Sequence, residues 1–316
     1  MRIASIDIGT NTVLLLVADV DEGGGIQPVL QEQRLPRLGR DVDLRRSIPA
    51  GAFDRGAWVV NEYKNLSNQL RAEIVVACAT SAVRDASNRE EFLAYLTKTT
   101  GITVSILDGD EEALWTHRGA VSALGEAAKE AAVIDIGGGS TELSYGAGDN
   151  GERKLQRWSL QLGSVRITER YLKHTPATAG ELRSASDFIV EELAQVRNPG
   201  LHRYTTIGVA GTVTTLACLD QGLPDFQADR VNGYILSRDR VANWLARLSG
   251  LTPQDIRSLS AATEGRSDIL TGGVLILSVM MDHLQIGRIT ASDRGLRYGL
   301  ILREWEKYSG IRRVRE

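Results

Sequence analysis

Two stretches of the sequence end an apolar run with an aspartate and then continue with small residues. The first is SIDIGTNTVLLLVADV (residues 5–20), and the second is VIDIGGGSTELSYG (residues 133–146). One such stretch alone is typical of an ordinary β-hairpin, in which Gly, Asp and Asn stabilise the turn. The repetition favours a functional turn, because successive backbone N–H groups in a tight turn can surround an anion.

Each turn is predicted to bind phosphate through backbone N–H groups and small polar side chains. The predicted phosphate-binding residues are Gly9, Thr10, Asn11 and Thr12 in the first turn, and Gly137, Gly138, Gly139, Ser140 and Thr141 in the second. Asp7 and Asp135 stand at the mouths of these turns, where a carboxylate would repel phosphate unless it held a cation. Each stretch is therefore interpreted as half of a site for phosphate and a metal ion, with the substrate between the halves.

The composition excludes several classes of protein. The chain has 316 residues, of which 42% are apolar, and this length predicts two domains with substantial cores. A formal net charge of −3 argues against a nucleic-acid partner. The two cysteines, Cys78 and Cys218, are predicted to be reduced core residues of a cytoplasmic protein. No apolar run is long enough to span a membrane, so no membrane partner is expected.

Alternating strands and helices around the turns predict an α/β fold. Strand patterns cover residues 3–8, 12–19, 26–33, 73–80, 102–107, 131–136, 141–146, 154–162, 204–211 and 288–293. Helical patterns cover residues 52–71, 89–101, 110–124, 164–172, 178–196, 266–284 and 295–308, and the basic stretch 34–46 is predicted to be a loop. Because the opening pattern restarts at residue 131, the sequence predicts two copies of one fold.

The repeat also predicts the domain boundaries. The first domain is expected at residues 1–120 and the second at 121–298, with a hinge near 118–128. The C-terminal helix, residues 299–316, is expected to pack back on the first domain.

Further motifs follow the two turns in a fixed order. They are ATSAVRDASN, LDGDEEALWTHRGA, QLGSVRITERYL, GVAGTVTTLACL and SDRGLRYGL. With the turns, this ordered set resembles the exopolyphosphatase and guanosine pentaphosphate phosphohydrolase (Ppx/GppA) family in its short two-domain form. The resemblance runs from residue 2 to about residue 300. It implies two ribonuclease H-like domains facing a central cleft, as in actin, the sugar kinases and the chaperone ATPases.

The resemblance implies roles for two charged residues whose function the bare sequence leaves open. Glu112, the second glutamate of the EEA motif, corresponds to the catalytic base of the family. Its position alone favours a solvated glutamate in the first turn of a helix. Arg84, in a motif that includes Thr80 and Asn88, corresponds to an arginine that contacts phosphate, for which a forked guanidinium is well suited.

A strand-to-helix turn supplies a third group of predicted phosphate-binding residues. Gly211 and Thr212 begin the expected helix after residues 204–211, where a helix N-terminus suits an anion. Arg266 matches a family position and is expected to line the path of the phosphates. The basic residues of 34–46 could also attract a polyanion, but they are more consistent with an ordinary solvated loop.

The predicted reaction is metal-assisted hydrolysis of a terminal phosphoanhydride bond. Asp135 and Glu142, with Asp7 as a further ligand, are expected to hold Mg²⁺ or another divalent cation, directly or through water. The substrate is inorganic polyphosphate, with guanosine pentaphosphate as the alternative, and a homodimer is a possible assembly. A kinase or ATPase of the same superfamily and a non-catalytic polyphosphate or alarmone sensor are the rival functions. The presence of Glu112 favours the hydrolase, because a sensor would not need a base.

Overall fold

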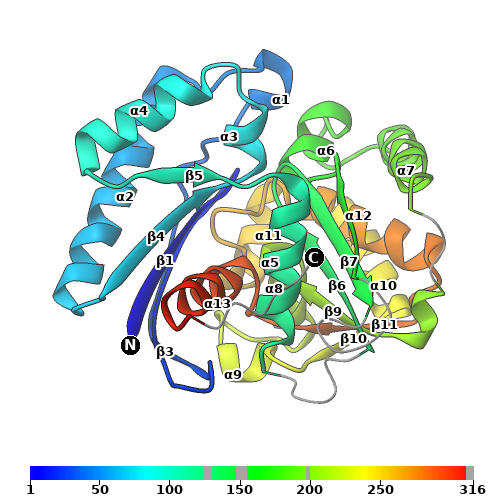
Figure 1. The fold of residues 1–316 in the computed structure, drawn as a ribbon. Helices are drawn as coiled ribbons and strands as arrows, with labels where there is room; N and C mark the ends of the chain where they lie inside the picture. Colours follow the sequence, from blue (N-terminus) through cyan, green and yellow to red (C-terminus); the bar gives the residue numbers. More distant parts are fainter. Residues whose placement is uncertain (124–129, 147–154, 197–199, 311–316) are drawn as a thin grey trace. The chain divides into compact units, whose positions relative to one another are not determined.

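The computed structural model of the chain (Figure 1) describes residues 1–123, 130–146, 155–196 and 200–310. The chain folds into two compact units. Unit 1 comprises Met1–Ala123 and Arg294–Glu316, and unit 2 comprises Leu124–Asp293. No helix among the described residues is long and apolar enough to cross a membrane.

The sheet of unit 1 has the strand order β3-β2-β1-β4-β5. β1 (Arg2–Ile8), β2 (Val13–Val20) and β3 (Ile26–Arg34) form the antiparallel meander that the sequence predicts. β4 (Ile74–Ala79) pairs parallel with β1, and β5 (Val104–Ile106) pairs parallel with β4. The carboxyl ends of β1 and β4 therefore lie at the same edge of the sheet, which places Asp7 near the residues that follow Ala79.

Helices cover both faces of this sheet (Figure 1). α2 (Ala50–Gln69) and α4 (Arg89–Thr100) pack on the face that Ala4, Ile6 and Ile8 present. α13 (Leu296–Tyr308) packs on the opposite face, where Ile3 contacts Tyr298 and Ile301, and it also lies against α5 (Gly109–Val121). Because side chains alternate along a strand, Asp7 shares the face of Ile3 and points to the side of α13 and α5.

The sheet of unit 2 has the strand order β10-β11-β9-β6-β7-β8. β6 (Ala131–Ile136), β7 (Thr141–Gly146) and β8 (Gln156–Leu160) are antiparallel, and β9 (Thr205–Val209) and β11 (Arg288–Ala291) continue the sheet in parallel from β6. β10 (Ile235–Ser237) closes it as an antiparallel edge.

The longer helices of unit 2 surround one large apolar cluster. They are α6 (Ser164–Tyr171), α7 (Ala179–Leu193), α8 (Ala210–Asp220), α10 (Arg238–Ser249) and α12 (Leu270–His283), with the shorter α9 (Ala228–Val231) and α11 (Pro253–Leu259). α12 is apolar almost all round and buried along most of its length, as expected for a helix at the centre of a core.

The two sheets share one topology, since β3-β2-β1-β4-β5 corresponds in order and direction to β8-β7-β6-β9-β11. The α/β class and the repeated fold predicted from the sequence are therefore confirmed. The domain boundaries predicted at residues 120 and 298 stay predictions. The two compact units meet after Ala123 and after Asp293 in the sequence, and α13 begins at Leu296.

Several local expectations differ from the structure. The stretch 34–46 ends β3 and contains a short helix, α1 (Val42–Arg45), and α3 (Ser81–Asp85) follows β4 without having been predicted. α12 begins at Leu270 rather than at residue 266, because residues 264–269 form turns with Gly265 at positive φ. Residues 124–128 of the expected hinge, residue 154 at the start of an expected strand and residues 311–316 of the expected C-terminal helix lie outside the described part of the chain.

Candidate active site

Glu111 and Glu112 are neighbours on the first turn of α5 but have different environments. Asp108 caps the helix, and the exposed Glu111 completes a capping box by accepting from the N–H of Asp108 while its own N–H donates to the Asp108 carboxylate. Glu112 is buried, with 7% of its surface exposed. The alternative of a solvated first-turn glutamate is therefore wrong for Glu112, and it describes Glu111 instead.

A buried ion pair joins the two predicted catalytic residues. Nη1 of Arg84 donates to Oε2 of Glu112 at 2.7 Å and to the Leu107 carbonyl at 3.0 Å. Burial raises the pKa of Glu112, while the charge and hydrogen bond of Arg84 and the hydroxyl of Thr80 oppose that rise. A carboxylate whose pKa is raised by burial is a stronger base than an exposed one, and Arg84 holds it in place.

Asp7 ends β1 on the face of the sheet that carries α5 and α13. Its Oδ1 atom is buried and has no hydrogen-bond partner among the described residues. Burial, followed by the negative charge of Glu112, raises the pKa of Asp7 to about 7, and the guanidinium of Arg297 acts against that rise. A buried carboxylate oxygen without a donor is a costly arrangement that a cation would relieve.

The donor chemistry at Asp7 fits a divalent cation, since a hard oxygen ligand without a partner is what Mg²⁺ binds. The described residues contain no group of three His, Cys, Asp or Glu side chains that could hold a metal by themselves. Protein-only coordination is thus not present within the described part of the chain. In proteins, Mg²⁺ is usually bound through one or two carboxylates together with water and substrate oxygens, which is consistent with this arrangement.

The β1–β2 turn is held in shape by the loop that follows β3. The Gly9 N–H donates to the Thr12 carbonyl at 3.0 Å and closes the turn. The carbonyls of Thr10 and Asn11 accept from the N–H groups of Gly39 and Arg37, at 2.7 and 3.1 Å. In a trans peptide the C=O and the following N–H point in opposite directions, so the N–H groups of Asn11 and Thr12 point away from this loop.

The β6–β7 turn repeats this arrangement with a helix in place of the loop. The Gly137 N–H donates to the Ser140 carbonyl at 3.0 Å. The first turn of α6 supplies donors to the carbonyls of Gly137 and Gly138, from the N–H groups of Ser164 and Val165, each at 2.9 Å.

The opposite side of this turn presents donors. By the same peptide geometry, the N–H groups of Gly138 and Gly139 point away from α6. Those of Gly138, Gly139 and Ser140 donate to no protein acceptor in the described part of the chain. Successive N–H groups of this kind form a concave anion site.

The polar residues beside this turn have defined partners. Asp135 and Glu142 lie directly opposite each other in the β6–β7 register, so their side chains share one face of the sheet. Glu142 is buried and accepts from the Ser159 hydroxyl at 2.7 Å. The Thr141 hydroxyl donates to the Leu162 carbonyl at 2.7 Å, so this hydroxyl already has a partner within the protein.

The third group of predicted phosphate-binding residues lies where β9 ends and α8 begins. Ala210 has a φ of 63°, a strained value for a residue with a Cβ, and Gly211 follows it. A Cβ on Gly211 would overlap the guanidinium of Arg266, so glycine is needed for the arginine to lie against the first turn of α8. Thr212 is buried beside Gly273 of α12. The structure thus brings Gly211, Thr212 and Arg266 together.

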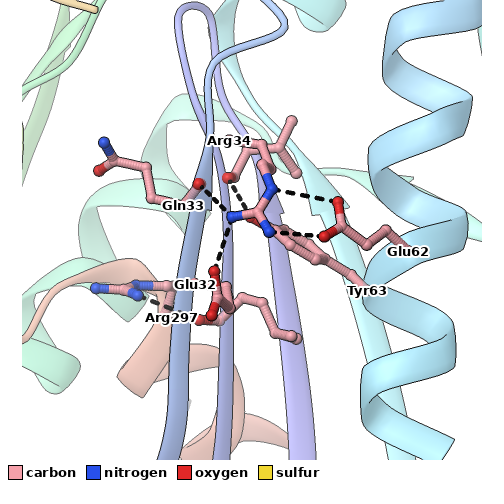
Figure 2. Close-up of polar contacts among 8 residues, drawn as sticks. Glu32, Gln33, Arg34, Glu62, Tyr63 and Arg297 are labelled. Atoms are coloured by element: carbon pink, nitrogen blue, oxygen red, sulfur yellow. Dashed lines mark hydrogen bonds and ion pairs between the residues drawn. The ribbon is translucent and has the colours of Figure 1, made fainter. Parts of the chain in front are cut away.

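The basic stretch 34–46 is anchored at its first residue, Arg34, which ends β3 (Figure 2). Its later arginines Arg40, Arg45 and Arg46 are exposed, as expected for solvated residues. Arg34 binds Glu62 of α2 through Nε and Nη2 at 3.2 and 2.6 Å, and it binds Glu32 through Nη1 at 2.7 Å. Asn88, a residue of the ATSAVRDASN motif, binds both backbone groups of Ile48. These contacts fasten the stretch that supports the β1–β2 turn.

Sequence reasoning gave no role to three residues that the structure places beside the candidate groups of their own units. Thr80 contacts Glu112, Arg297 lies near Asp7, and Arg166 is buried under the glycine turn. Each stands in a motif that carries the family resemblance. The sequence therefore contained a signal for them, but which group each side chain contacts depends on packing between distant segments.

Comparisons with known proteins identify the family of this chain. Residues 16–308 match the model of the Ppx/GppA phosphatase family. A protein of Mycobacterium tuberculosis named exopolyphosphatase 2 is 34% identical over 95% of this chain and 98% of its own length. The crystal structure of an exopolyphosphatase-like protein is 31% identical, with a TM-score of 0.89 over 96% of this chain and 97% of that one.

A second solved structure, the PPX-GPPA enzyme of Aquifex aeolicus, is 29% identical, with a TM-score of 0.80 over 96% of this chain and 99% of that chain. Both structures cover the two units together, so the similarity does not rest on one shared domain. The chain belongs to the Ppx/GppA phosphatase family.

Proposed function

We propose that this chain is an exopolyphosphatase, which hydrolyses the terminal phosphoanhydride bond of inorganic polyphosphate and releases orthophosphate. The observation that carries the proposal is the difference between Glu111 and Glu112. Of the two, only Glu112 is buried and bound to an arginine, and burial raises its pKa. These are the properties of a general base rather than of a helix cap.

Glu112 accepts a proton from the attacking water in this mechanism. Arg84 keeps the buried carboxylate in position before substrate binds, and its guanidinium is suited to the equatorial oxygens of the transferred phosphoryl group. When a phosphate competes for Arg84, the carboxylate loses part of its ion pair, and its affinity for a proton rises. Substrate binding and activation of the base are thereby coupled.

The remaining phosphates bind to backbone donors. The N–H groups of Gly138, Gly139 and Ser140 face away from α6 and suit one phosphate, and those of the β1–β2 turn suit another. Arg266 and the first turn of α8 offer a cationic group for a further phosphate.

Asp7 is the proposed first contact for Mg²⁺ or another divalent cation, and Asp135 and Glu142 are the other proposed ligands. A bound cation would neutralise phosphate oxygens and offset their repulsion from these carboxylates. Each carboxylate–phosphate pair at ~5 Å costs roughly 3 kcal/mol at an effective dielectric constant of ~20.

The sequence also bears on the compartment, assembly and substrate of the protein. The buried cysteines, which form no disulfide, suit a cytoplasmic protein. A homodimer is a possible assembly, which sedimentation analysis tests. Guanosine pentaphosphate is the competing substrate.

One assay tests the proposal. Phosphate release is measured from polyphosphates of several lengths, from guanosine pentaphosphate and from ATP, each with Mg²⁺ and with a chelator. Metal-dependent release from polyphosphate is expected. Turnover of ATP without turnover of polyphosphate would instead support a kinase-like ATPase, and binding of polyphosphate without any release would support a sensor.

A further inference from the structure

Arg166 stands on the first turn of α6, directly behind the glycine turn that joins β6 to β7. Only 4% of its surface is exposed. Its Nε donates to the Gly139 carbonyl at 2.7 Å in a buried hydrogen bond, and its backbone N–H donates to the Gly138 carbonyl at 3.2 Å. A buried guanidinium is costly, so its presence here calls for a specific function.

The Arg166 side chain completes a series that the backbone of α6 begins. The Gly137 carbonyl accepts from Ser164 and the Gly138 carbonyl from Val165. The next carbonyl along the turn, that of Gly139, lies beyond the backbone donors of the helix and is bound by the Arg166 side chain. Three successive carbonyls are thus held on the α6 side.

Holding the Gly139 carbonyl also fixes the Ser140 N–H, because both belong to one peptide plane and point in opposite directions. A charged donor on the carbonyl polarises that peptide, which strengthens the N–H as a donor on the other side. We propose that Arg166 is a positioning residue of the phosphate site, which acts through the Gly139–Ser140 peptide without touching the substrate. The proposal rests on the proposed function of the turn in binding phosphate.

Unit 1 provides a contrast. There the equivalent carbonyls, those of Thr10 and Asn11, are held by backbone N–H groups of Gly39 and Arg37. The turn carbonyls are therefore bound by a loop backbone in unit 1, and by a helix backbone and a buried side chain in unit 2. The side chain serves the glycine triplet, whose lack of Cβ atoms leaves its peptides freer to rotate.

The test is calorimetric titration of inorganic triphosphate into the full chain carrying Glu112→Gln, which should slow turnover of the ligand during the titration. Arg166→Met in that background is expected to raise the dissociation constant by about 10–100-fold, the usual effect of losing a charge-assisted hydrogen bond. Arg166→Lys keeps the charge but not the planar fork, and an intermediate loss is expected.

Ile167→Val is the matched control, because Ile167 is the next residue of α6, fully buried, and does not bond to the turn. It should lower the melting temperature and leave the dissociation constant within twofold. A purely structural role for Arg166 predicts the same behaviour in Arg166→Met. A dissociation constant within twofold of the parent in folded Arg166→Met would therefore overturn the proposal.

A measurement on the parent protein covers the case in which neither Arg166 variant folds. Addition of triphosphate should shift the amide resonance of Ser140 and slow its hydrogen exchange. A Ser140 amide that does not respond to bound triphosphate would overturn the proposal as firmly.

The outcomes also separate this proposal from the proposed function. If the wild-type chain binds triphosphate through Ser140, Arg166→Met weakens that binding and no phosphate is released from polyphosphate, the exopolyphosphatase function fails and the role of Arg166 stands. If the wild-type chain hydrolyses polyphosphate and the Arg166 variants bind triphosphate normally, only the role of Arg166 fails.

Discussion

The β1–β2 turn of unit 1 and the β6–β7 turn of unit 2 have the same backbone plan and different surroundings. Both close with a glycine N–H donating to the carbonyl three residues later, at 3.0 Å. Beside the first turn lie Asp7 and the ion pair of Arg84 with Glu112. The pKa values of Asp7 and Glu112 are raised. Beside the second lie a helix and a buried arginine that hold peptide carbonyls.

Under the proposed function, this difference gives different tasks to the two copies of the fold. The titratable carboxylates of unit 1 suit proton transfer and metal binding, which need groups that change charge. The ordered peptides of unit 2 suit binding of phosphate, which needs fixed dipoles that cost no reorganisation. Substitutions that act on only one unit should therefore affect turnover and binding separately.

Glu112→Gln gives the largest expected effect. It keeps the size of the side chain and removes the base, so turnover of polyphosphate should fall by about 10²–10⁴-fold. Binding should be unchanged or slightly tighter, since a negative charge has been removed beside a polyanion. Glu111→Gln is the matched control, because Glu111 only caps α5, and it should cost at most about 1 kcal/mol of stability with normal turnover. Turnover of Glu112→Gln within threefold of wild type would remove Glu112 as the base.

Asp7→Asn tests the cost of the buried carboxylate. The pKa of Asp7 is about 7 in the folded chain, against its ordinary value of 3.8. Above pH 7 the folded chain must carry this buried charge, and as the pH falls from 7 to 4 it takes up a proton that the unfolded chain does not. In metal-free protein, Asp7→Asn should therefore stabilise by about 2–4 kcal/mol at pH 8 and by little at pH 4.

Urea denaturation at the two pH values measures this effect. Asp19→Asn is the control, because Asp19 is bound to Arg2 at 2.7 Å and its pKa is lowered. It should have a slight effect of the opposite sign at pH 8. A metal-free Asp7→Asn protein that is less stable than wild type at pH 8 would contradict the assignment of Asp7 as a strained carboxylate.

Gly163→Ala and Gly39→Ala compare the supports of the two turns. A Cβ on Gly163 would overlap the backbone of Gly138 and Gly139, whereas a Cβ on Gly39 would meet chiefly the side chain of Thr10. Both should cost about 1–3 kcal/mol of stability through overpacking. Only Gly163→Ala should displace the peptides of the turn, and its KM for polyphosphate should rise at least ~10-fold. Equal KM values for the two variants would mean that the glycine turn does not bind substrate.

Asp135→Ala has the smallest expected effect. Asp135 occupies the place in unit 2 that Asp7 has in unit 1, at the end of the first strand before the turn. If it helps to hold Mg²⁺, the Mg²⁺ concentration for half-maximal activity should rise about 10-fold. A titration curve identical to that of wild type would confine the metal-binding role to unit 1.

The sequence by itself determined the repeated fold, both turns and the family. These follow from local patterns: apolar runs of strand length, turn residues at fixed places, and motifs in a fixed order. It also placed Glu112 and Arg84 among the candidates through resemblance. It missed short elements such as α1 and α3, because four or five residues carry too little periodicity to be recognised.

Only the tertiary structure decided which of two adjacent glutamates is the buried one. Glu111 and Glu112 differ by one position on a helix, and their environments depend on where α3 and β5 lie against α5. The tertiary structure also decided that Oδ1 of Asp7 is buried without a hydrogen-bond partner among the described residues. It likewise brought Arg166 to the Gly139 carbonyl, 27 residues earlier in the sequence. Burial and hydrogen bonding are properties of segments brought together from distant parts of the chain, and these properties set the pKa of a carboxylate and the direction of a peptide.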